Sequence, residues 1–311
     1  MFRFTTSLAV LILTSCLFGQ NLQKADDLNS RGLKFYRSGD YDAAIEAFNK
    51  AIDLTSRLVP KPAPAKNSLF PTDSSEESFL TDNIRVVDPR TAIALVNRGN
   101  VYFARSELDR AIKDYDEAIR ILPGFAPAYI ARASVWLIKR EFPRALNDQS
   151  RAIKLEPKNA TAHIARAVTH IDMGDKAAAL KDIQAALTIE PDNAEAIFRR
   201  GDIFRTTNDF AQALTDYERA IQLDSDCAGA YVGRAAIRFG QGKYEDAVAD
   251  YTKAIHADGR LAQVYKLRGY TLLYLKRDEE AQRDFDRAAR MAPRFKAEIE
   301  EVATIIKGKR K

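Results

Sequence analysis

The sequence predicts an all-α protein built as a solenoid of seven helical hairpins. Three observations predict this fold: a unit that recurs every 34 residues, small residues at the same sites in each unit, and turn residues or prolines between the helices. A single hairpin cannot bury its own apolar side, so neighbouring units are expected to stack on one another.

Overall composition excludes several classes of protein. Apolar residues make up 46% of the 311 residues and charged residues 29%, which is typical of a folded chain and not of a disordered one. Lysine and arginine (48) exceed aspartate and glutamate (43) by only five over the whole chain. This diffuse surplus does not predict a nucleic-acid groove, so no nucleic-acid partner is expected.

Residues 1–19 read as an export signal, with one early cation at Arg3 and a short apolar run after it. The run is shorter than the roughly 20 apolar residues that a bilayer span needs. Leu13 to Cys16 resembles the lipobox of bacterial lipoproteins, which predicts lipidation at Cys16 and a lipoprotein on the periplasmic side of a membrane. The alternative is a soluble periplasmic or secreted protein cut after a small residue such as Gly19.

Boundaries of the seven units follow from the repeat itself. Five units after the second follow without insertion, and one unit lies upstream of them. The predicted units are 25–58, 92–125, 126–159, 160–193, 194–227, 228–261 and 262–295.

Small residues mark where the two helices of each hairpin cross. Every unit carries glycine or alanine in its first half and two alanines seven residues apart in its second half, and these two alanines share one helix face. A large residue such as Tyr115 or Phe285 follows the first alanine by four residues in most units. Four units close with proline, at Pro123, Pro157, Pro191 and Pro293.

Together these residues resemble the tetratricopeptide repeat (TPR), over about three quarters of the chain. The resemblance implies a right-handed α-solenoid in which the first helix of each hairpin lines a concave groove that binds a partner protein or peptide. The implied groove residues are Ile93, Val96, Asn97, Asn100, Phe103, Ile130, Ser134, Leu137, Ile164, Val168, Phe198, Asp202 and Arg205. About half of the apolar members are expected to pack against the next repeat instead.

Two segments interrupt or end the array. Residues 59–91 are rich in proline and serine and are predicted to form a loop, with Asp88 and Pro89 starting the next helix. After Pro293, an apolar stripe that includes Ile299 and Ile306 predicts a capping helix and basic tail over 296–311.

A charge pair recurs at a spacing of sixteen residues in the six contiguous units. Arginine precedes the small residue of the first helix, and an aspartate follows at the same height of the second helix. A row of isolated arginines could bind anions, but a matching aspartate each time favours a structural ladder of ion pairs. The predicted pairs are Arg98 and Asp114, Arg132 and Asp148, Arg166 and Asp182, Arg200 and Asp216, Arg234 and Asp250, and Arg268 and Asp284.

No constellation in the sequence predicts catalysis, a cofactor or a metal site. His163 and His170 lie seven residues apart, but His170 occupies a site that is aromatic in other units, which favours a packing role. We therefore expect a non-enzymatic scaffold or adaptor of the bacterial cell envelope. The alternative is a regulatory cofactor subunit of an envelope hydrolase.

Overall fold

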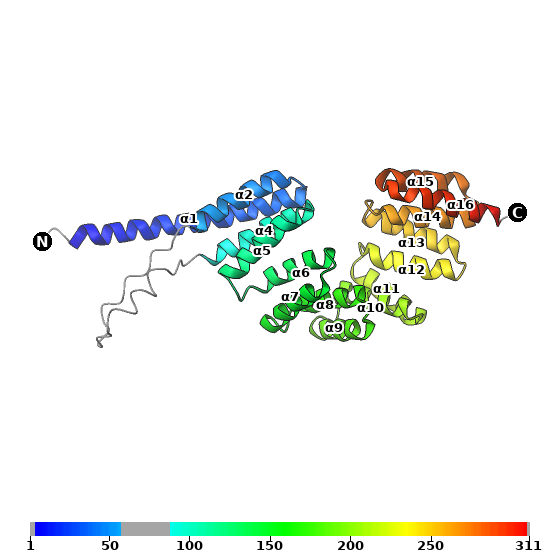
Figure 1. Ribbon diagram of the computed structural model, residues 1–311, viewed down its shortest axis with the longest axis horizontal. Helices are drawn as coiled ribbons and strands as arrows, with labels where there is room; N and C mark the ends of the chain where they lie inside the picture. Colours follow the sequence, from blue (N-terminus) through cyan, green and yellow to red (C-terminus); the bar gives the residue numbers. More distant parts are fainter. Residues whose placement is uncertain (1–3, 57–87, 310–311) are drawn as a thin grey trace. The chain divides into compact units, whose positions relative to one another are not determined.

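The computed structural model describes residues 4–56 and 88–309, with side chains from residue 20 onward, and this part of the chain contains helices and no strand (Figure 1). Its helices form seven hairpins in chain order, as predicted. These are α1 (Phe4–Ser38) with α2 (Tyr41–Thr55), α4 (Pro89–Ala104) with α5 (Leu108–Ile121), α6 (Ala126–Ile138) with α7 (Phe142–Leu155), α8 (Ala160–Asp172) with α9 (Lys176–Ile189), α10 (Ala194–Thr206) with α11 (Phe210–Leu223), α12 (Ala228–Gly240) with α13 (Tyr244–Ala257), and α14 (Ala262–Tyr274) with α15 (Asp278–Met291).

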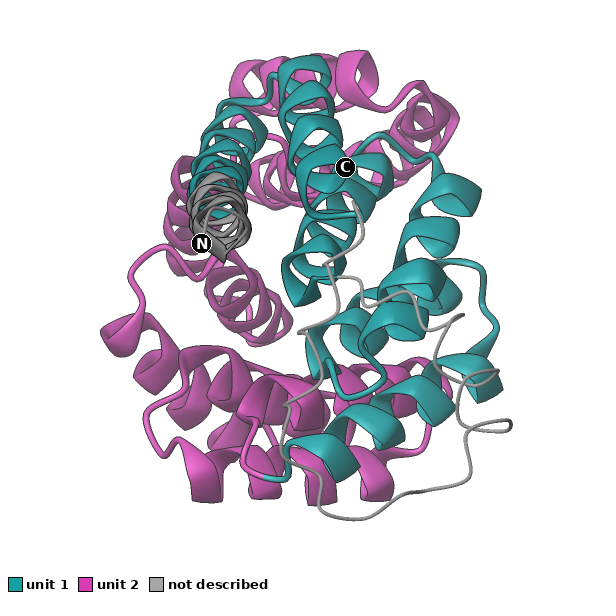
Figure 2. Cartoon of the chain, turned by 90° about the vertical axis from the view of Figure 1, so that its left-hand side faces the viewer, with its two compact units in different colours: residues 1–157 teal, residues 158–311 magenta. Residues whose placement is uncertain are grey.

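The chain divides into two compact units, residues 1–157 and 158–311 (Figure 2). The first unit holds the first three hairpins, and the second holds the other four together with the C-terminal helix α16 (Lys296–Gly308). In each unit the two helices of a hairpin pack on each other and on the hairpin that follows within the unit.

Residues in the turn of each hairpin end the first helix and start the second. One residue at each turn adopts a left-handed backbone conformation, with φ between 58° and 82°. These residues are Gly39, Ser106, Arg140, Gly174, Asn208, Gly242 and Lys276. In three hairpins an aspartate then caps the second helix by accepting a backbone N–H, as Asp175 does from Ala178 at 3.0 Å.

Small residues allow the two helices of a hairpin to approach closely, as the repeat pattern predicts. An aromatic ring of the second helix lies where the first helix has glycine. A Cβ added to Gly99 would lie 2.5 Å from the Tyr115 ring. Tyr115 and the alanines on either side of it, Ala111 and Ala118, are buried in the same core cluster. Packing at this density leaves little room for a larger side chain at the glycine.

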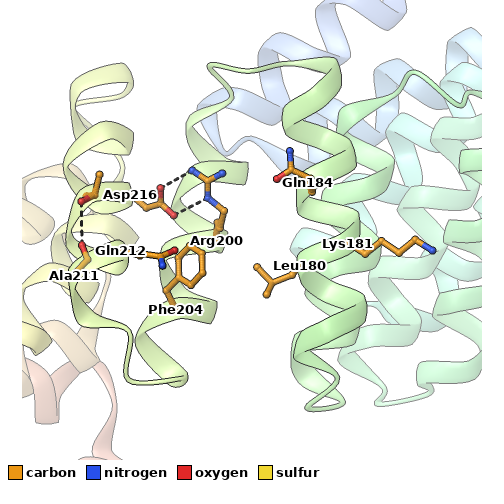
Figure 3. Close-up of a pocket in the computed structure, with 9 residues that line it drawn as sticks. Leu180, Lys181, Gln184, Arg200, Phe204, Ala211, Gln212 and Asp216 are labelled. Carbon is orange, nitrogen blue, oxygen red and sulfur yellow. Dashed lines mark hydrogen bonds and ion pairs between the residues drawn. The ribbon is translucent and has the colours of Figure 1, made fainter.

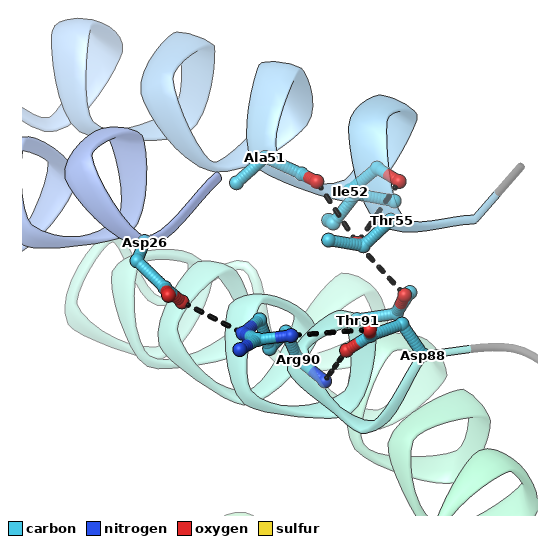
Figure 4. A network of polar contacts seen from close by, with 7 residues as sticks. All are labelled: Asp26, Ala51, Ile52, Thr55, Asp88, Arg90 and Thr91. Carbon is cyan, nitrogen blue, oxygen red and sulfur yellow. Dashed lines mark hydrogen bonds and ion pairs between the residues drawn. The ribbon is translucent and has the colours of Figure 1, made fainter. Parts of the chain in front are cut away.

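A polar network joins the first hairpin to α4 (Figure 4). The Thr91 hydroxyl donates to the Thr55 hydroxyl at 2.8 Å, and both threonines are buried. Arg90 forms ion pairs with Asp26 at 3.1 Å and with Asp88 at 3.2 Å. Helix α4 therefore stacks on the first hairpin although residues 57–87 separate them in the sequence.

One predicted boundary changes in the structure. Helix α4 begins at Pro89 with Asp88 as its N-cap, so the last three residues of the predicted 59–91 loop are helical. This agrees with the expectation that Asp88 and Pro89 start the helix, because proline is favoured in the first helical turn. The rest of that loop prediction falls on residues 57–87, which lie outside the described residues.

Helix α1 runs through most of the predicted export signal. Its backbone is helical from Phe4, but the side chains of residues 1–19, Cys16 included, lie outside the described residues. Within the described part of the chain, no helix is both long enough and apolar enough to cross a membrane.

The C-terminal helix closes the second unit. A 3₁₀ turn over Pro293–Phe295 leads into α16, and Ile299 and Ile306 are buried against the last hairpin, as predicted for a cap. Lys266 of α14 is only 4% exposed, and its ammonium donates to both carboxylate oxygens of Glu298 at 2.7 Å. This pair satisfies a buried charge and fixes α16 on α14. Residues 310–311 of the predicted tail are outside the description.

Candidate functional site

The main candidate site is a cavity of about 620 Å³ along the first helices of the last three hairpins. Helices α10, α12 and α14 line it, together with the turn before α14. A second cavity of about 410 Å³ adjoins it, because Arg205 and Ala236 line both. We call the two together the first-helix groove.

Apolar side chains form the floor of the first-helix groove. Val232 and Ala236 of α12 and Leu267 of α14 contribute to it, and Phe198 of α10 lies at one side. Gly229 faces the Phe198 ring, and a Cβ added to Gly229 would lie only 2.5 Å from that ring. Gly229 therefore allows Phe198 of α10 to pack closely against α12.

A hydrogen-bonded group of three side chains forms a polar edge of the groove. The Tyr217 hydroxyl donates to Oδ1 of Asp202 at 2.8 Å, and Nε of Arg205 donates to the Tyr217 hydroxyl at 3.2 Å. Burial raises the pKa of the Tyr217 phenol well above its usual range, and the neighbouring Asp202 carboxylate adds to the effect. The phenol therefore stays protonated and holds Asp202 and Arg205 in place.

Charges around the groove are balanced. Arg199 and Arg205 are matched by Asp202 and Asp258 among the lining residues. Arg199 also pairs with Glu195 at 2.7 Å, and its guanidinium lies 4.9 Å from the centre of the Phe198 ring. An apolar floor with fixed polar groups of both signs is the usual character of a site that binds a peptide or small molecule.

Three of the residues predicted for the groove line it: Phe198, Asp202 and Arg205. Two others, Val96 and Ile164, do not line it and are buried in the core, as expected for about half of the apolar members, although Phe198 is itself only 9% exposed. Val96 is 6% exposed and lies in a cluster with residues of α6, while Ile164 is 8% exposed and clusters with residues of α10. In both cases the first helix of the next hairpin covers the side chain.

Both predicted asparagines, Asn97 and Asn100, already have hydrogen-bond partners within the compact unit of residues 1–157. Nδ2 of Asn97 donates to Oδ1 of Asn29 at 2.8 Å, which links α4 to α1. Oδ1 of Asn100 accepts from the Tyr115 hydroxyl at 2.8 Å, the same role that Asp202 has with Tyr217 three repeats later. These asparagines position neighbouring side chains in the structure.

The other predicted groove residues stay on the surface or partly buried. Ile93 is 39% exposed, and the Ser134 hydroxyl donates to the backbone of its own helix at 3.2 Å. The half-buried members are Phe103, Ile130, Leu137 and Val168. A binding role for these positions stays a prediction.

Sequence reasoning did not identify the contribution of α12. Gly229, Val232, Gly233 and Ala236 line the groove, and none was among the predicted site residues. A signal was present, since Gly229, Gly233 and Ala236 stand where the fifth unit carries the larger residues Glu195, Arg199 and Asp202.

All six arginine–aspartate pairs of the predicted ladder are present. In each pair Nε and Nη2 of the arginine donate to the two carboxylate oxygens, at distances of 2.6 to 2.9 Å. These bonds raise the pKa of each arginine and keep it charged. The six aspartates are at most 6% exposed, which fits a structural role.

The two histidines singled out in the fourth unit both approach a ladder aspartate. Nδ1 of His163 lies 3.6 Å from Asp182, and Nε2 of His170 lies 3.9 Å from it. Among the residues with described side chains, no group of three or more histidine, cysteine or acidic residues could hold a metal ion.

Comparison with protein families gives matches along most of the array. Three models described as tetratricopeptide repeat match residues 28–57, residues 92–125, and overlapping segments that together span 139–262. A curated relative, RNA polymerase II-associated protein 3 of Mus musculus, is 32% identical over 111 residues, which are 32% of this chain and 16% of that protein. The match therefore spans about one sixth of the relative's length.

Solved structures resemble the fold over nearly the whole chain. A tetratricopeptide repeat protein from Parabacteroides merdae has a TM-score of 0.61 and 21% identity, covering 91% of this chain and 99% of that one. Yeast Tom70 has a TM-score of 0.60 and 19% identity, covering 92% of this chain and 65% of that one. At these identities the likeness concerns the fold alone.

Proposed function

Because the chain belongs to the tetratricopeptide repeat family, we propose that it is a protein-interaction scaffold that binds an extended segment of a partner protein in the first-helix groove. The observation that carries this proposal is the cavity of about 620 Å³ on α10, α12 and α14. Its volume lies in the range of sites that enclose a ligand, roughly 300 to 1,000 Å³.

The lining of the groove supports a partner segment with an apolar anchor and flanking charges. Val232, Ala236 and Leu267 offer apolar surface for a buried side chain, the part of an interface that supplies most of its affinity. Arg205 and Asp202 are fixed by Tyr217, so they can pair with charged or polar groups of the segment at little cost in conformational entropy.

Filling the groove is the direct test. Ala236 lines both cavities and is partly exposed, so Ala236→Arg places a long side chain across the groove without entering the core. We expect proteins captured from solubilised envelopes of the host by the wild type to fall at least about tenfold with this variant. Quantitative mass spectrometry, with a circular dichroism melt to verify folding, provides the measurement.

Ala177→Arg is the matched control, because Ala177 is exposed on α9 and does not line the groove. It should capture the same partners as the wild type. Equal capture by Ala236→Arg, when that variant is folded, would show that the partner uses another surface.

The proposed scaffold acts at the bacterial cell envelope, held there by a lipid on Cys16. The support is the sequence of residues 1–19, in which an apolar run precedes Leu13 to Cys16. Growth with radioactive palmitate should label the wild-type protein and leave Cys16→Ser unlabelled. Label that persists in Cys16→Ser, or no label in either protein, would contradict the lipid anchor.

A further inference from the structure

A separate cavity of about 720 Å³ lies among α9, α10 and α11 (Figure 3). We call it the α9–α11 pocket. It shares no lining residue with the first-helix groove. Leu180 of α9 and Phe204 of α10 face each other across it, whereas the Lys181 side chain points away. The ladder pair of Arg200 and Asp216 also lines it.

The repeat provides an internal comparison for this pocket. An equivalent cavity lies two hairpins later, where Thr252 and Arg268 stand 68 residues after Gln184 and Arg200. That cavity measures only about 290 Å³. The same architecture therefore gives a small cavity in one place and a larger one in the other.

The third nitrogen of the ladder arginine explains part of this difference. Where Nε and Nη2 hold the aspartate of their own hairpin, Nη1 reaches back to the preceding hairpin. Nη1 of Arg98 donates to Oδ1 of Asn49 at 2.6 Å, and Nη1 of Arg268 donates to the Thr252 hydroxyl at 3.0 Å. In two other hairpins a carboxylate of the preceding hairpin lies next to Nη1. Nη1 of Arg132 bonds Asp116 at 2.5 Å, and Nη1 of Arg234 lies 4.0 Å from Glu218.

Arg200 departs from this pattern. Its Nε and Nη2 hold Asp216 at 2.9 and 2.8 Å, but its Nη1 has no polar contact with any described residue. Gln184 occupies the site equivalent to Asp116, lines the pocket and does not reach the guanidinium. The side chain of Arg200 is 31% exposed and lines the pocket.

We propose that the α9–α11 pocket is a second protein-binding site, in which a glutamate or aspartate of a partner segment bonds Nη1 of Arg200. The chain itself shows this chemistry, because Asp116 places a carboxylate on the same edge of Arg132. An apolar side chain next to the acidic residue packs between Leu180 and Phe204. The open donor and the apolar walls thus select an acidic residue with an apolar neighbour.

The probe is a hexapeptide, Gly-Ser-Leu-Glu-Ser-Gly, acetylated and amidated so that glutamate carries its only charge. It is titrated into the full chain and followed by NMR at the backbone amides and arginine side chains. We expect saturable shifts at Arg200 and Phe204 with a Kd of about 1 mM or below, and binding at least about tenfold weaker when glutamine replaces glutamate.

Substitution at Gln184 separates this site from a nonspecific anion effect. Gln184→Glu supplies a carboxylate of the chain's own, as Asp116 does, and should weaken peptide binding at least about tenfold. Gln184→Ala leaves the guanidinium edge open and should keep binding within about twofold. Gln222→Glu, an exposed site on α11 outside the pocket, makes the same charge change and should bind like the wild type.

Three results would each overturn the proposal: no saturable shift at Arg200, equal binding of the glutamine peptide, or undiminished binding to Gln184→Glu. Because Gln184 is exposed, its variants should fold, which a thermal melt verifies. Binding in the first-helix groove is tested by different residues, so either site can fail without the other.

Discussion

Replacing Asp250 with alanine is expected to lower the free energy of unfolding by about 3 kcal/mol, because it leaves two guanidinium groups without their buried partner. Asp250 is 2% exposed and accepts from Nε and Nη2 of Arg234 at 2.9 and 2.7 Å. It also accepts from Nη1 of Arg238 at 2.9 Å. Urea denaturation followed by circular dichroism measures the loss.

Asp246→Ala is the control for this effect. Asp246 lies on the same helix, in its exposed first turn, so its loss should cost no more than about 1 kcal/mol. A double-mutant cycle with Arg234→Met isolates the pair, since the double variant should lose less than the sum of the single losses. Additive losses, or a loss below about 1 kcal/mol for Asp250→Ala, would mean that the ladder does not stabilise the fold.

The ladder of arginine–aspartate pairs shows which contacts could be predicted from the sequence and which could not. The sixteen-residue spacing predicted each pair, because residues of one hairpin keep the same height in every repeat. Sequence reasoning did not predict the third contact of the arginine, whose acceptor comes from the preceding hairpin, as Asn49 does for Arg98. That contact depends on the distance between stacked hairpins, which periodicity does not give.

The groove was predicted only in part for a related reason. Helical periodicity places Val96, Ile164 and Phe198 on one stripe, but it does not determine how closely the next helix approaches. The following helix covers the first two, and Phe198, although only 9% exposed, borders a cavity and fills the space beside Gly229. The side chains of the next helix decide which parts of the stripe stay open.

Gly233→Ala is expected to cost about 2 kcal/mol of stability and to disrupt the polar edge of the first-helix groove. A Cβ at Gly233 would lie 2.6 Å from the Tyr217 hydroxyl, and closer still to its ring. The ring cannot simply retreat, since a Cβ at Gly201 on its other side would lie only 3.0 Å away. The steric clash between the new Cβ and Tyr217 must therefore be relieved by a displacement of the Tyr217 side chain or of α12.

Any such shift alters the hydrogen bond from Tyr217 to Asp202 and the contact with Arg205, which together form the groove edge. Capture of groove partners should fall at least about tenfold even when the variant is folded. Gly240→Ala on the same helix is the stability control, because no atom lies within 4 Å of its Cβ site. It should leave stability unchanged or raise it by up to about 1 kcal/mol. If Gly233→Ala melts like the wild type and keeps its partners, Tyr217 does not set the geometry of the groove.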